Sequence, residues 1–377
     1  MNTKQKKELL KGALDAGGGI VRLAPAWVPR AFLVPGGRLK LAPQDTYALG
    51  AHRGGIDERW LASTTNADNG PGTPEDEGLS YIVVNDDSGI KKILLKEAIE
   101  LLGDDFLGKT VMEKYNGWMV LTKFFDNLGP IPHHLHQKDE HAAKVGRKGK
   151  PEAYYFPPQL NFMGNNFPYT FFGLEPGTTK EDVKRCLEKW EEGDNGILYL
   201  SKAYKLKPGT GWNVPGGILH APGSYVTYEP QKASDVFALF QSMVEGKYVP
   251  REMLVKDVPK KLHNDLDYII SMIDWDENVD PEFVKHHYLE PKPVEDMDTM
   301  SSKGYVENWV TYGSEEFSTK ELTVFPDRKV KILDKDAYGL ILVQGRGTIG
   351  KMAVETPTMI RFGELTKDEL FVSYETA

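Results

Sequence analysis

The sequence lacks the features that mark secreted, membrane-spanning and nucleic-acid-binding proteins. One cysteine, Cys186, among 377 residues leaves no disulfide framework within the chain. No apolar run approaches the length of a membrane span, and the basic, amphipathic start has no apolar stretch of the kind that secretory signals carry. A formal net charge of -9 argues against nucleic acid or an anionic membrane as the main partner. These absences predict a chain that works in a reduced, cytoplasmic setting.

Glycine and proline are plentiful, whereas long helical patterns are scarce. The 37 glycines and 24 prolines punctuate short runs of apolar or alternating residues, which is typical of a mainly β protein with many turns. Helical spacing over 91–102, a capping pattern of Thr178 with Glu181 and the stretch 259–275 predict three helices. The strand candidates are 81–85, 118–125, 152–156, 170–173, 212–214, 226–229 and 236–241.

The order of these elements predicts two β lobes with a helical connector. We place the first lobe, with inserted helices, at 20–250, the connector and linker at 251–302, and the second lobe at 303–377. "QGRGTIG" in the second lobe is a hairpin signal, since Gly345 and Gly347 can take positive φ angles. The second lobe contains no histidine. The polar chemistry is therefore expected in the first lobe.

Histidines gather in "GPIPHHLHQKDEHA", which holds four of the nine in the chain. His134 and His136 are two residues apart, so on a strand both point to the same face. Glu152 begins a later predicted strand, and His220 follows a Pro-Gly-Gly turn. Two histidines, a carboxylate and a distant third histidine suit a first-row divalent cation that keeps room for water or substrate.

A surface loop rich in histidine is the competing interpretation, and it would be preferred for the His-x-His pair alone. The later Glu and His favour a metal site. His133 would point to the opposite face and is interpreted either as a residue that supports the ligands or as a structural one. His141, in "KDEHAAK", is interpreted as a solvated side chain of a short helix. The remaining histidines receive no role: His52, His263, His286 and His287.

These segments resemble the cupin superfamily, and within it the class I mannose-6-phosphate isomerases. "WMVLTKFFDNLGPIPHHLHQKDEHA" is similar to that family's apolar strand and first ligands, "GKPEAYYF" to its Lys-x-Glu strand, and "GWNVPGGILHAPGSYVTYEPQKASD" to its last motifs. "ERWLAS" resembles an earlier Trp-containing segment. The resemblance covers roughly 48–241. It implies double-stranded β-helix (cupin or jelly-roll) barrels, two of them in a bicupin, with a few peripheral helices.

The second barrel would be metal-free and matches only as a generic cupin lobe. The chain ends at "FVSYETA", where such a barrel normally has one more strand pair. Two alternatives stay open: a shortened chain, or a strand pair that comes from the amino-terminal segment.

The resemblance also implies a site. The family's metal ligands fall on His134, His136, Glu152 and His220, and the first of these is a departure, since the family usually has glutamine there. Zinc is the family's metal, although manganese, iron or nickel suit three His and one Glu as well. The residues that match the family's remaining motif positions, and that are the catalytic candidates, are Lys150, Glu229 and Lys123.

The implied activity is interconversion of an aldose and a ketose by a metal-dependent, mannose-6-phosphate isomerase-like enzyme. Its implied partner is a small carbohydrate substrate. We expect a monomer or a homodimer. The family's sugar-phosphate-contacting arginine is missing, because no Arg or Lys occurs over 233–245 and Leu239 or a neighbour takes its place. Phosphate recognition is therefore open. The alternatives are a non-catalytic sugar-binding cupin and a metal-dependent cupin oxygenase or epimerase.

Overall fold

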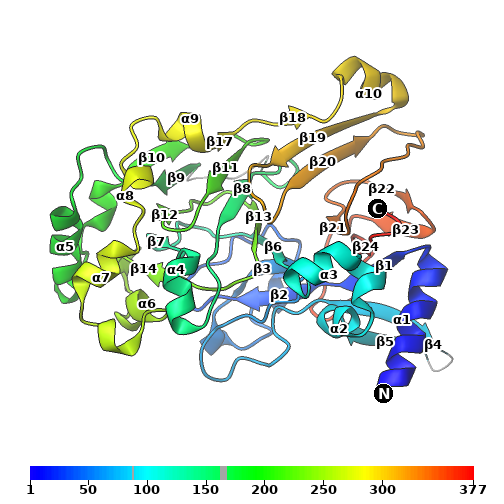
Figure 1. Ribbon diagram of the computed structural model, residues 1–377, viewed down its shortest axis with the longest axis horizontal. Coiled ribbons are helices and arrows are strands. Elements are labelled where there is room, and N and C mark those ends of the chain that lie inside the picture. Colours follow the sequence, from blue (N-terminus) through cyan, green and yellow to red (C-terminus); the bar gives the residue numbers. More distant parts are fainter. Residues whose placement is uncertain (87–88, 162–167) are drawn as a thin grey trace.

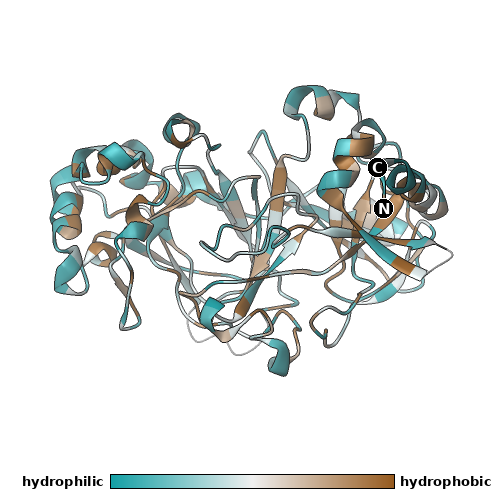
Figure 2. Cartoon of the chain, turned by 90° about the horizontal axis from the view of Figure 1, so that it is seen from below, coloured by the Kyte–Doolittle hydropathy of each residue, from teal (hydrophilic) through white to brown (hydrophobic). Residues whose placement is uncertain are grey.

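The computed structural model describes residues 1–86, 89–161 and 168–377 and is mainly β, as predicted. β-sheets occupy the middle of the molecule, a group of short helices caps one end, and both termini lie at the other end (Figure 1). Figure 2 shows apolar segments concentrated in the strands and polar ones on the outer helices. No helix in the described part of the chain is long and apolar enough to cross a membrane.

The largest sheet has seven antiparallel strands in the order β17-β11-β8-β13-β6-β3-β2. In that order the strands are β17 (Tyr288–Leu289), β11 (Gly211–Val214), β8 (Glu152–Tyr155), β13 (Thr227–Lys232), β6 (Val120–Phe125), β3 (Ile56–Leu61) and β2 (Ala26–Pro29). All six residues of β3 and all four of β8 are buried. Because both faces of these strands are covered, their charged side chains need partners inside the protein.

A five-stranded antiparallel sheet faces the first. In order, its strands are β10 (Lys202–Lys205), β9 (Tyr169–Phe172), β12 (His220–Ala221), β7 (His134–Leu135) and β14 (Ala238–Leu239). Aromatic rings fill the space between the two sheets: the Phe172 ring of β9 lies 5.0 Å from the Trp212 ring of β11 and 5.9 Å from the Tyr154 ring of β8, measured between centroids. The two sheets therefore form a packed sandwich. The strands that carry His134 and His220, β7 and β12, belong to the second of these sheets.

A second five-stranded sheet joins the two ends of the chain. In order, its strands are β21 (Tyr338–Ile341), β24 (Glu369–Val372), β1 (Ile20–Ala24), β4 (Tyr81–Asp86) and β5 (Gly89–Leu94). Ile20 pairs with Val372. The amino-terminal segment thus supplies β1, which pairs with the last strand. The division into two cupin barrels and its boundaries stay a prediction.

Three smaller antiparallel sheets complete the β-structure of the described residues. They contain β15 (Met243–Val244) with β16 (Lys247–Tyr248), β18 (Lys292–Pro293) with β19 (Tyr305–Thr311) and β20 (Thr319–Val324), and β22 (Arg346–Ile349) with β23 (Met352–Glu355). Gly345 has a positive φ as predicted, but Gly347 lies within β22, and the two-residue turn falls at Gly350 and Lys351.

The helices surround these sheets. They are α1 (Thr3–Gly17), α2 (Leu95–Leu107), α3 (Lys109–Tyr115), α4 (Asp139–Ala142), α5 (Lys180–Glu188), α6 (Glu252–Val255), α7 (Leu266–Ser271), α8 (Trp275–Asn278), α9 (Phe283–His287) and α10 (Met297–Lys303). Residues of α5, α6 and α7 share one apolar core with β7 and β14. This helical end therefore supports the strands that carry the histidines.

Three helix predictions need correction. Over 91–102 the first four residues belong to β5, because Ile93 pairs with Ile82 of β4, and the helix begins only at Leu95. The stretch 259–275 is broken into a short 3-10 turn, α7 and the first residue of α8. The capping box of α5 is formed by Thr179 and Asp182, one residue later than predicted.

Candidate metal centre

Three histidines meet where two very short strands pair. His134 of β7 lies directly opposite His220 of β12, and His136 follows β7 by one residue. The turn before β12 contains Gly217, which has a φ of 88° and donates its backbone N–H to the carbonyl of His136 at 2.7 Å. One potential ligand atom of each imidazole lies within 4.8 Å of the others, and all three rings are buried. This group could hold a metal ion.

A backbone carbonyl orients each of the three imidazoles. The Nδ1-to-oxygen distances are 2.6, 2.7 and 2.8 Å for His134 to Pro132, His136 to Val236 and His220 to Ile218. A carbonyl oxygen can only accept, so each Nδ1 carries a proton, and in the neutral ring Nε2 keeps its lone pair. Burial lowers the pKa of His134 well below its usual value and that of His136 to about 4. Both rings are therefore neutral at pH 7, which is the form in which an imidazole can bind a metal ion.

The Glu152 carboxylate of β8 reaches the same point from the facing sheet. Its Oε2 lies 3.0 Å from Nε2 of His136, and its Oε1 lies 3.2 Å from Nε2 of His220. Burial alone would raise the pKa of Glu152, but its interactions with the His136 ring and with the Lys150 ammonium hold that pKa well below its usual range. Lone pairs facing a carboxylate repel unless a cation lies between them. Three imidazole nitrogens and a carboxylate oxygen are a donor set that first-row divalent metals accept, so these residues fit a metal ion.

Two neighbours hold Glu152 in position. The Tyr154 hydroxyl donates to Oε1 at 2.6 Å. The Lys150 ammonium lies 2.9 Å from Oε2, and it also lies 2.9 Å from Nε2 of His136. Positive charge is thus already placed among the predicted ligands, as their lone pairs require.

Buried charges of alternating sign extend from Lys150 across the sheet. Its Nζ lies 3.5 Å from Glu229 of β13, which lies 3.4 Å from Lys123 of β6. Lys123 in turn contacts Glu58 of β3 at 3.1 Å, and Glu58 contacts Arg30 at 3.2 Å. Glu229 of β13 lies directly opposite Lys123 of β6, and Glu58 lies two residues before Trp60, the β3 residue opposite Lys123, so Glu58 and Lys123 are diagonal neighbours. All seven predicted site residues thus lie in one connected cluster, whose catalytic and metal-binding roles stay predictions.

Within this row of buried charges, the Glu229 carboxyl group has a pKa that is raised close to neutrality. Burial first, and then the charge of Glu152, raise the pKa of Glu229 to about 7, while Lys123 and Lys150 act in the opposite direction. A carboxyl group that titrates near neutrality can both take and return a proton at pH 7.

Sequence reasoning assigned no role to three buried charged groups of this cluster. They are Arg30, Glu58 and Asp235. Glu58 stands in "ERWLAS" and shares a strand face with Trp60, to whose indole N–H it is bonded at 2.8 Å. The available signal was the run Asp57, Glu58 and Arg59 inside a strand that also contains Trp60 and Leu61, since buried charged residues need partners.

The other histidine predictions have mixed outcomes. His133 lies outside the three-histidine group and is fully buried, and burial lowers its pKa to about 3. His141 lies in α4 as predicted, but its side chain is buried instead of solvated. Leu239 pairs with His134 and packs in the apolar core, so this backbone position presents no cation to the site.

No family model and no curated protein matches the sequence. Several solved structures, however, match the fold. Mannose 6-phosphate isomerase from Bacillus subtilis aligns over 95% of each chain with a TM-score of 0.58 and 17% identity. The fold is that of the mannose-6-phosphate isomerases.

Two further structures of that group align over 95% of each chain. A zinc-bound mannose 6-phosphate isomerase has a TM-score of 0.59 and 14% identity, and a mutant of phosphomannose isomerase from Salmonella typhimurium has a TM-score of 0.58 and 14% identity. At such identities the likeness concerns the fold. The resemblance inferred from the motifs is confirmed at that level, and activity has to be argued from the site.

Proposed function

We propose that this chain is a metal-dependent isomerase that interconverts an aldose and a ketose. The observation that carries the proposal is the convergence of three Nδ1-anchored histidines on the Glu152 carboxylate. In this proposal His134, His136, Glu152 and His220 hold the ion, and zinc is the first candidate, because the donor set suits it and structures of this fold bind it. Manganese, iron and nickel accept the same donors.

The isomerisation moves one proton between two adjacent carbons of the sugar and a second proton between the oxygens on those carbons. A divalent ion, when bound, supplies Lewis acidity that polarises the carbonyl and stabilises negative charge on its oxygen. Glu229 takes the carbon-bound proton and returns it to the neighbouring carbon, for which a pKa of about 7 is suited. Lys123, 3.4 Å away, holds the Glu229 carboxylate in place. Lys150 keeps Glu152 ionised and can donate to a substrate oxygen.

Proton exchange at C2 tests this proposal. Metal-loaded protein is incubated in D₂O with a panel of free and phosphorylated aldoses and ketoses, and deuterium incorporation is followed by NMR. We expect exchange and isomer formation with at least one sugar, and none after chelation. A sugar that binds without any exchange would favour the non-catalytic sugar-binding alternative.

His134 supports a second candidate function. Because it stands where the resembled isomerases have glutamine, the donor set is three His and one Glu, which also holds iron or manganese for oxygen or epimerase chemistry. Iron in the purified protein together with substrate-dependent oxygen uptake would support an oxygenase. Zinc without oxygen uptake supports the isomerase.

A further inference from the structure

Each of the three carbonyls that orient the histidine rings belongs to a peptide group that is also held from its other side. The carbonyls are those of Pro132, Val236 and Ile218, which accept from Nδ1 of His134, His136 and His220 respectively. In a planar trans peptide the N–H of the next residue points away from the carbonyl. That N–H can therefore bond on the side that faces away from the ring.

A side-chain oxygen accepts each of these three N–H groups. The distances are 2.9 Å from the His133 N–H to Oε1 of Gln241, 3.0 Å from the Phe237 N–H to Oδ2 of Asp257, and 2.9 Å from the Leu219 N–H to Oδ1 of Asn278. Each histidine ring is thus the last member of a relay that runs from a side-chain oxygen through one peptide group to Nδ1. The three relays have the same order of groups, although their peptides lie in separate segments of the chain.

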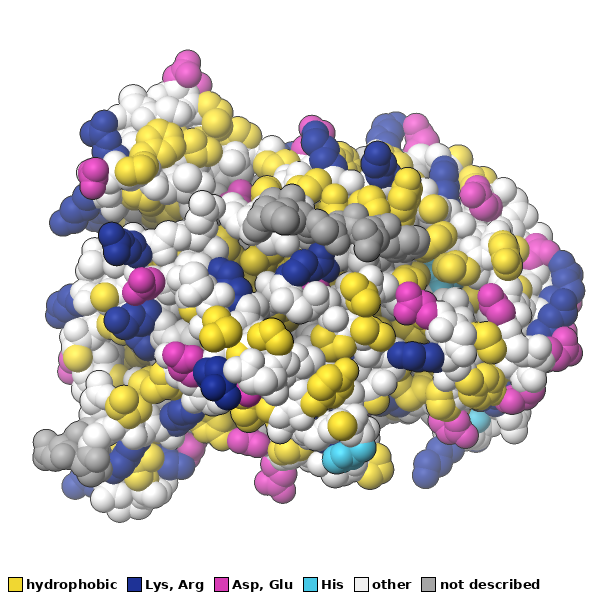
Figure 3. Space-filling view, turned by 180° about the vertical axis from the view of Figure 1, so that it is seen from behind, with side chains coloured by type: hydrophobic (Ala, Val, Ile, Leu, Met, Phe, Trp, Pro, Cys, Tyr) yellow, Lys and Arg dark blue, Asp and Glu magenta, His cyan; other side chains and the backbone are white. Residues whose placement is uncertain are grey.

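The three acceptor side chains are buried. Gln241, Asp257 and Asn278 are 6%, 6% and 1% exposed, unlike the charged side chains of both signs that are intermixed over the rear face (Figure 3). Gln241 follows β14, Asp257 follows α6, and Asn278 ends α8. A buried side chain cannot readily exchange a protein partner for water, so these hydrogen bonds hold one geometry.

Further bonds fix the two amide side chains among these acceptors. The Asn278 amide nitrogen donates to the carbonyls of Gly217 and Asp274 at 2.8 and 2.6 Å. The Gln241 amide nitrogen donates to the carbonyl of Met243 at 2.8 Å. Because a carbonyl oxygen can only accept, these partners determine which end of each amide is the nitrogen and leave its oxygen for the peptide N–H.

We propose that Gln241, Asp257 and Asn278 are positioning residues of the metal centre, each of which fixes the orientation and the Nδ1–H tautomer of one histidine. A peptide whose N–H donates a hydrogen bond becomes a better acceptor at its carbonyl, because the bonds in such a chain polarise one another. The carbonyl then holds the proton on Nδ1, so Nε2 keeps its lone pair for the metal ion. These roles rest on the metal centre of the function proposed above, but not on the reaction. The pairs are Gln241 with His134, Asp257 with His136, and Asn278 with His220.

Substitutions that keep the approximate size of each side chain but remove its oxygen test the proposal through zinc affinity. The variants are Gln241→Met, Asp257→Leu and Asn278→Leu, and chelator competition measures the zinc Kd of each full-length, initially metal-free protein. We expect each Kd to rise about tenfold, which is the lower end of the cost of losing a group that supports a metal ligand. Asp257→Asn keeps an oxygen acceptor and should stay within about threefold of the wild type.

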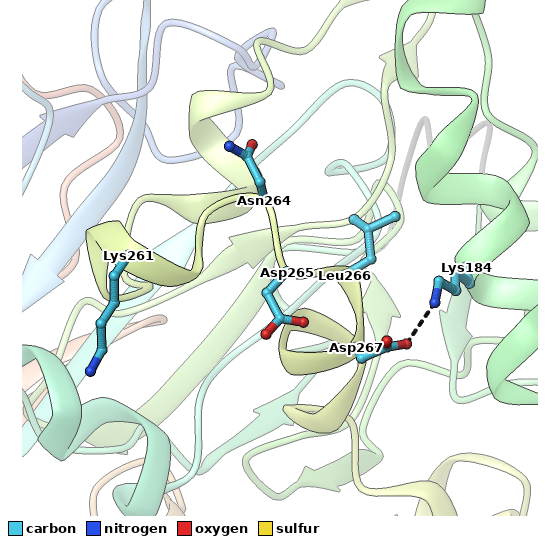
Figure 4. A pocket seen from close by; sticks show the side chains of 6 residues that line it. All are labelled: Lys184, Lys261, Asn264, Asp265, Leu266 and Asp267. Carbon is cyan, nitrogen blue, oxygen red and sulfur yellow. Dashed lines mark hydrogen bonds and ion pairs between the residues drawn. The ribbon is translucent and has the colours of Figure 1, made fainter.

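Two controls separate positioning from a general loss of stability. Asn161 is a matched amide that is 6% exposed, accepts from the Val226 N–H at 2.9 Å and donates to the Val226 carbonyl at 2.8 Å, away from the three peptides that hold the histidine rings. Asp265 caps α7, where it accepts from the Tyr268 N–H at 2.9 Å and lines a surface hollow of about 530 Å³ (Figure 4). Asn161→Leu and Asp265→Ala should both leave the zinc Kd unchanged.

Nitrogen-15 NMR of the imidazoles gives a readout that a general loss of stability would not produce. In each variant we expect one histidine to lose the protection of its Nδ1–H from hydrogen exchange while the other two keep it. The expected pairs are His134 in Gln241→Met, His136 in Asp257→Leu and His220 in Asn278→Leu. The proposal is overturned if all three variants keep the wild-type zinc Kd and Nδ1–H signals, or if every variant affects the three rings equally. Gln241→Met is nearly isosteric and decides alone if a leucine variant does not fold.

The outcomes also separate the positioning roles from the proposed reaction. If the zinc and NMR patterns hold but no sugar shows exchange at C2, the isomerase proposal fails while the positioning roles stand. If sugar exchange is present but the three variants keep the wild-type zinc Kd, the positioning roles fail while the isomerase proposal stands.

Discussion

At the scale of single residues, the nitrogen that a histidine leaves free decides what it can bind. The sequence predicted which histidines meet, but not which nitrogen faces the centre. For His134 and His220 the Nδ1 partner is a carbonyl two residues earlier, a local contact. For His136 it is the carbonyl of Val236, 100 residues away. That partner becomes visible only once the fold brings β14 beside β7.

Loss of one ligand should remove the metal. His136→Ala and Glu152→Ala each delete a donor from a buried group, so we expect metal affinity to fall by about 100-fold or more while the fold survives. Elemental analysis after dialysis measures this. His133→Ala, which alters a neighbour outside the three-histidine group, should keep its metal. Stoichiometric metal in both ligand variants would refute the assignment.

Glu229→Gln tests the proposed base. The amide keeps the shape of the side chain but cannot take a proton, so C2 exchange should fall by roughly 10²- to 10⁴-fold. Metal content should stay at the wild-type level, because in the described part of the chain Lys150 stands between Glu229 and the predicted ligand Glu152. A variant that keeps most of its exchange rate would place the base elsewhere, even if metal is retained.

Only some of the buried charges that extend from Lys150 could be predicted from the sequence. Lys123, Lys150 and Glu229 were identified because their motifs resemble a family, whereas Arg30 and Glu58 were not, although they are equally buried. Their partners come from strands far apart in the sequence, and only strand order places β3 next to β6. A single sequence shows that buried charged residues need partners of opposite charge, but it does not show which residues those partners are.

At the scale of elements, strand pairing overrode local helical spacing. The pattern over 91–102 has helical periodicity, yet its first residues pair with β4 because the hairpin buries Ile93 against Ile82. Similarly, the predicted strand 236–241 forms only the two-residue β14. The strands β8 and β6 were predicted within two residues of their observed bounds, since their apolar and aromatic content leaves few alternatives.

The joint between β24 and β3 gives the fold a pH dependence. Glu369 of β24 accepts from Arg59 at 3.0 Å and from the Ala62 N–H at 3.0 Å. Burial first, opposed by Arg59, raises the pKa of Glu369 from 4.5 to about 7. The folded state therefore binds a proton that the unfolded state has lost, and stability falls as pH rises from about 4.5 to about 7.

Glu369→Gln should remove this dependence. Between pH 4.5 and pH 7.5 the wild type should lose roughly 2–3 kcal/mol more unfolding free energy than the variant does, as measured by urea denaturation. Glu355→Gln, at an exposed position on β23, should behave like the wild type. Parallel pH profiles for Glu369→Gln and the wild type would contradict the raised pKa.

At the scale of the whole molecule, the two ends of the chain form one sheet. β24 lies between β21 and β1, so the last strand is internal to that sheet and bordered by the first strand of the chain. The sequence left this open, because an amino-terminal strand carries no mark of a partner about 350 residues later. Figure 1 shows both termini at this end, away from the helices that support the histidine strands.

A substitution in the sheet that joins the two ends of the chain should lower the unfolding free energy of the protein. Leu370 of β24 is fully buried, so Leu370→Ala should cost about 2–5 kcal/mol of unfolding free energy. Leu333→Ala, at a side chain that is 72% exposed, should change it by less than about 0.5 kcal/mol. Equal effects in denaturant titrations would show that the pairing of the two ends does not contribute to stability.

Anomalous X-ray diffraction at the absorption edge of the metal found in the purified protein tests the central claim most directly. We expect one ion per chain, bound by Nε2 of His134, His136 and His220 and by the carboxylate of Glu152. An ion at any other position, or no ion after loading with zinc, manganese, iron and nickel in turn, would contradict the account.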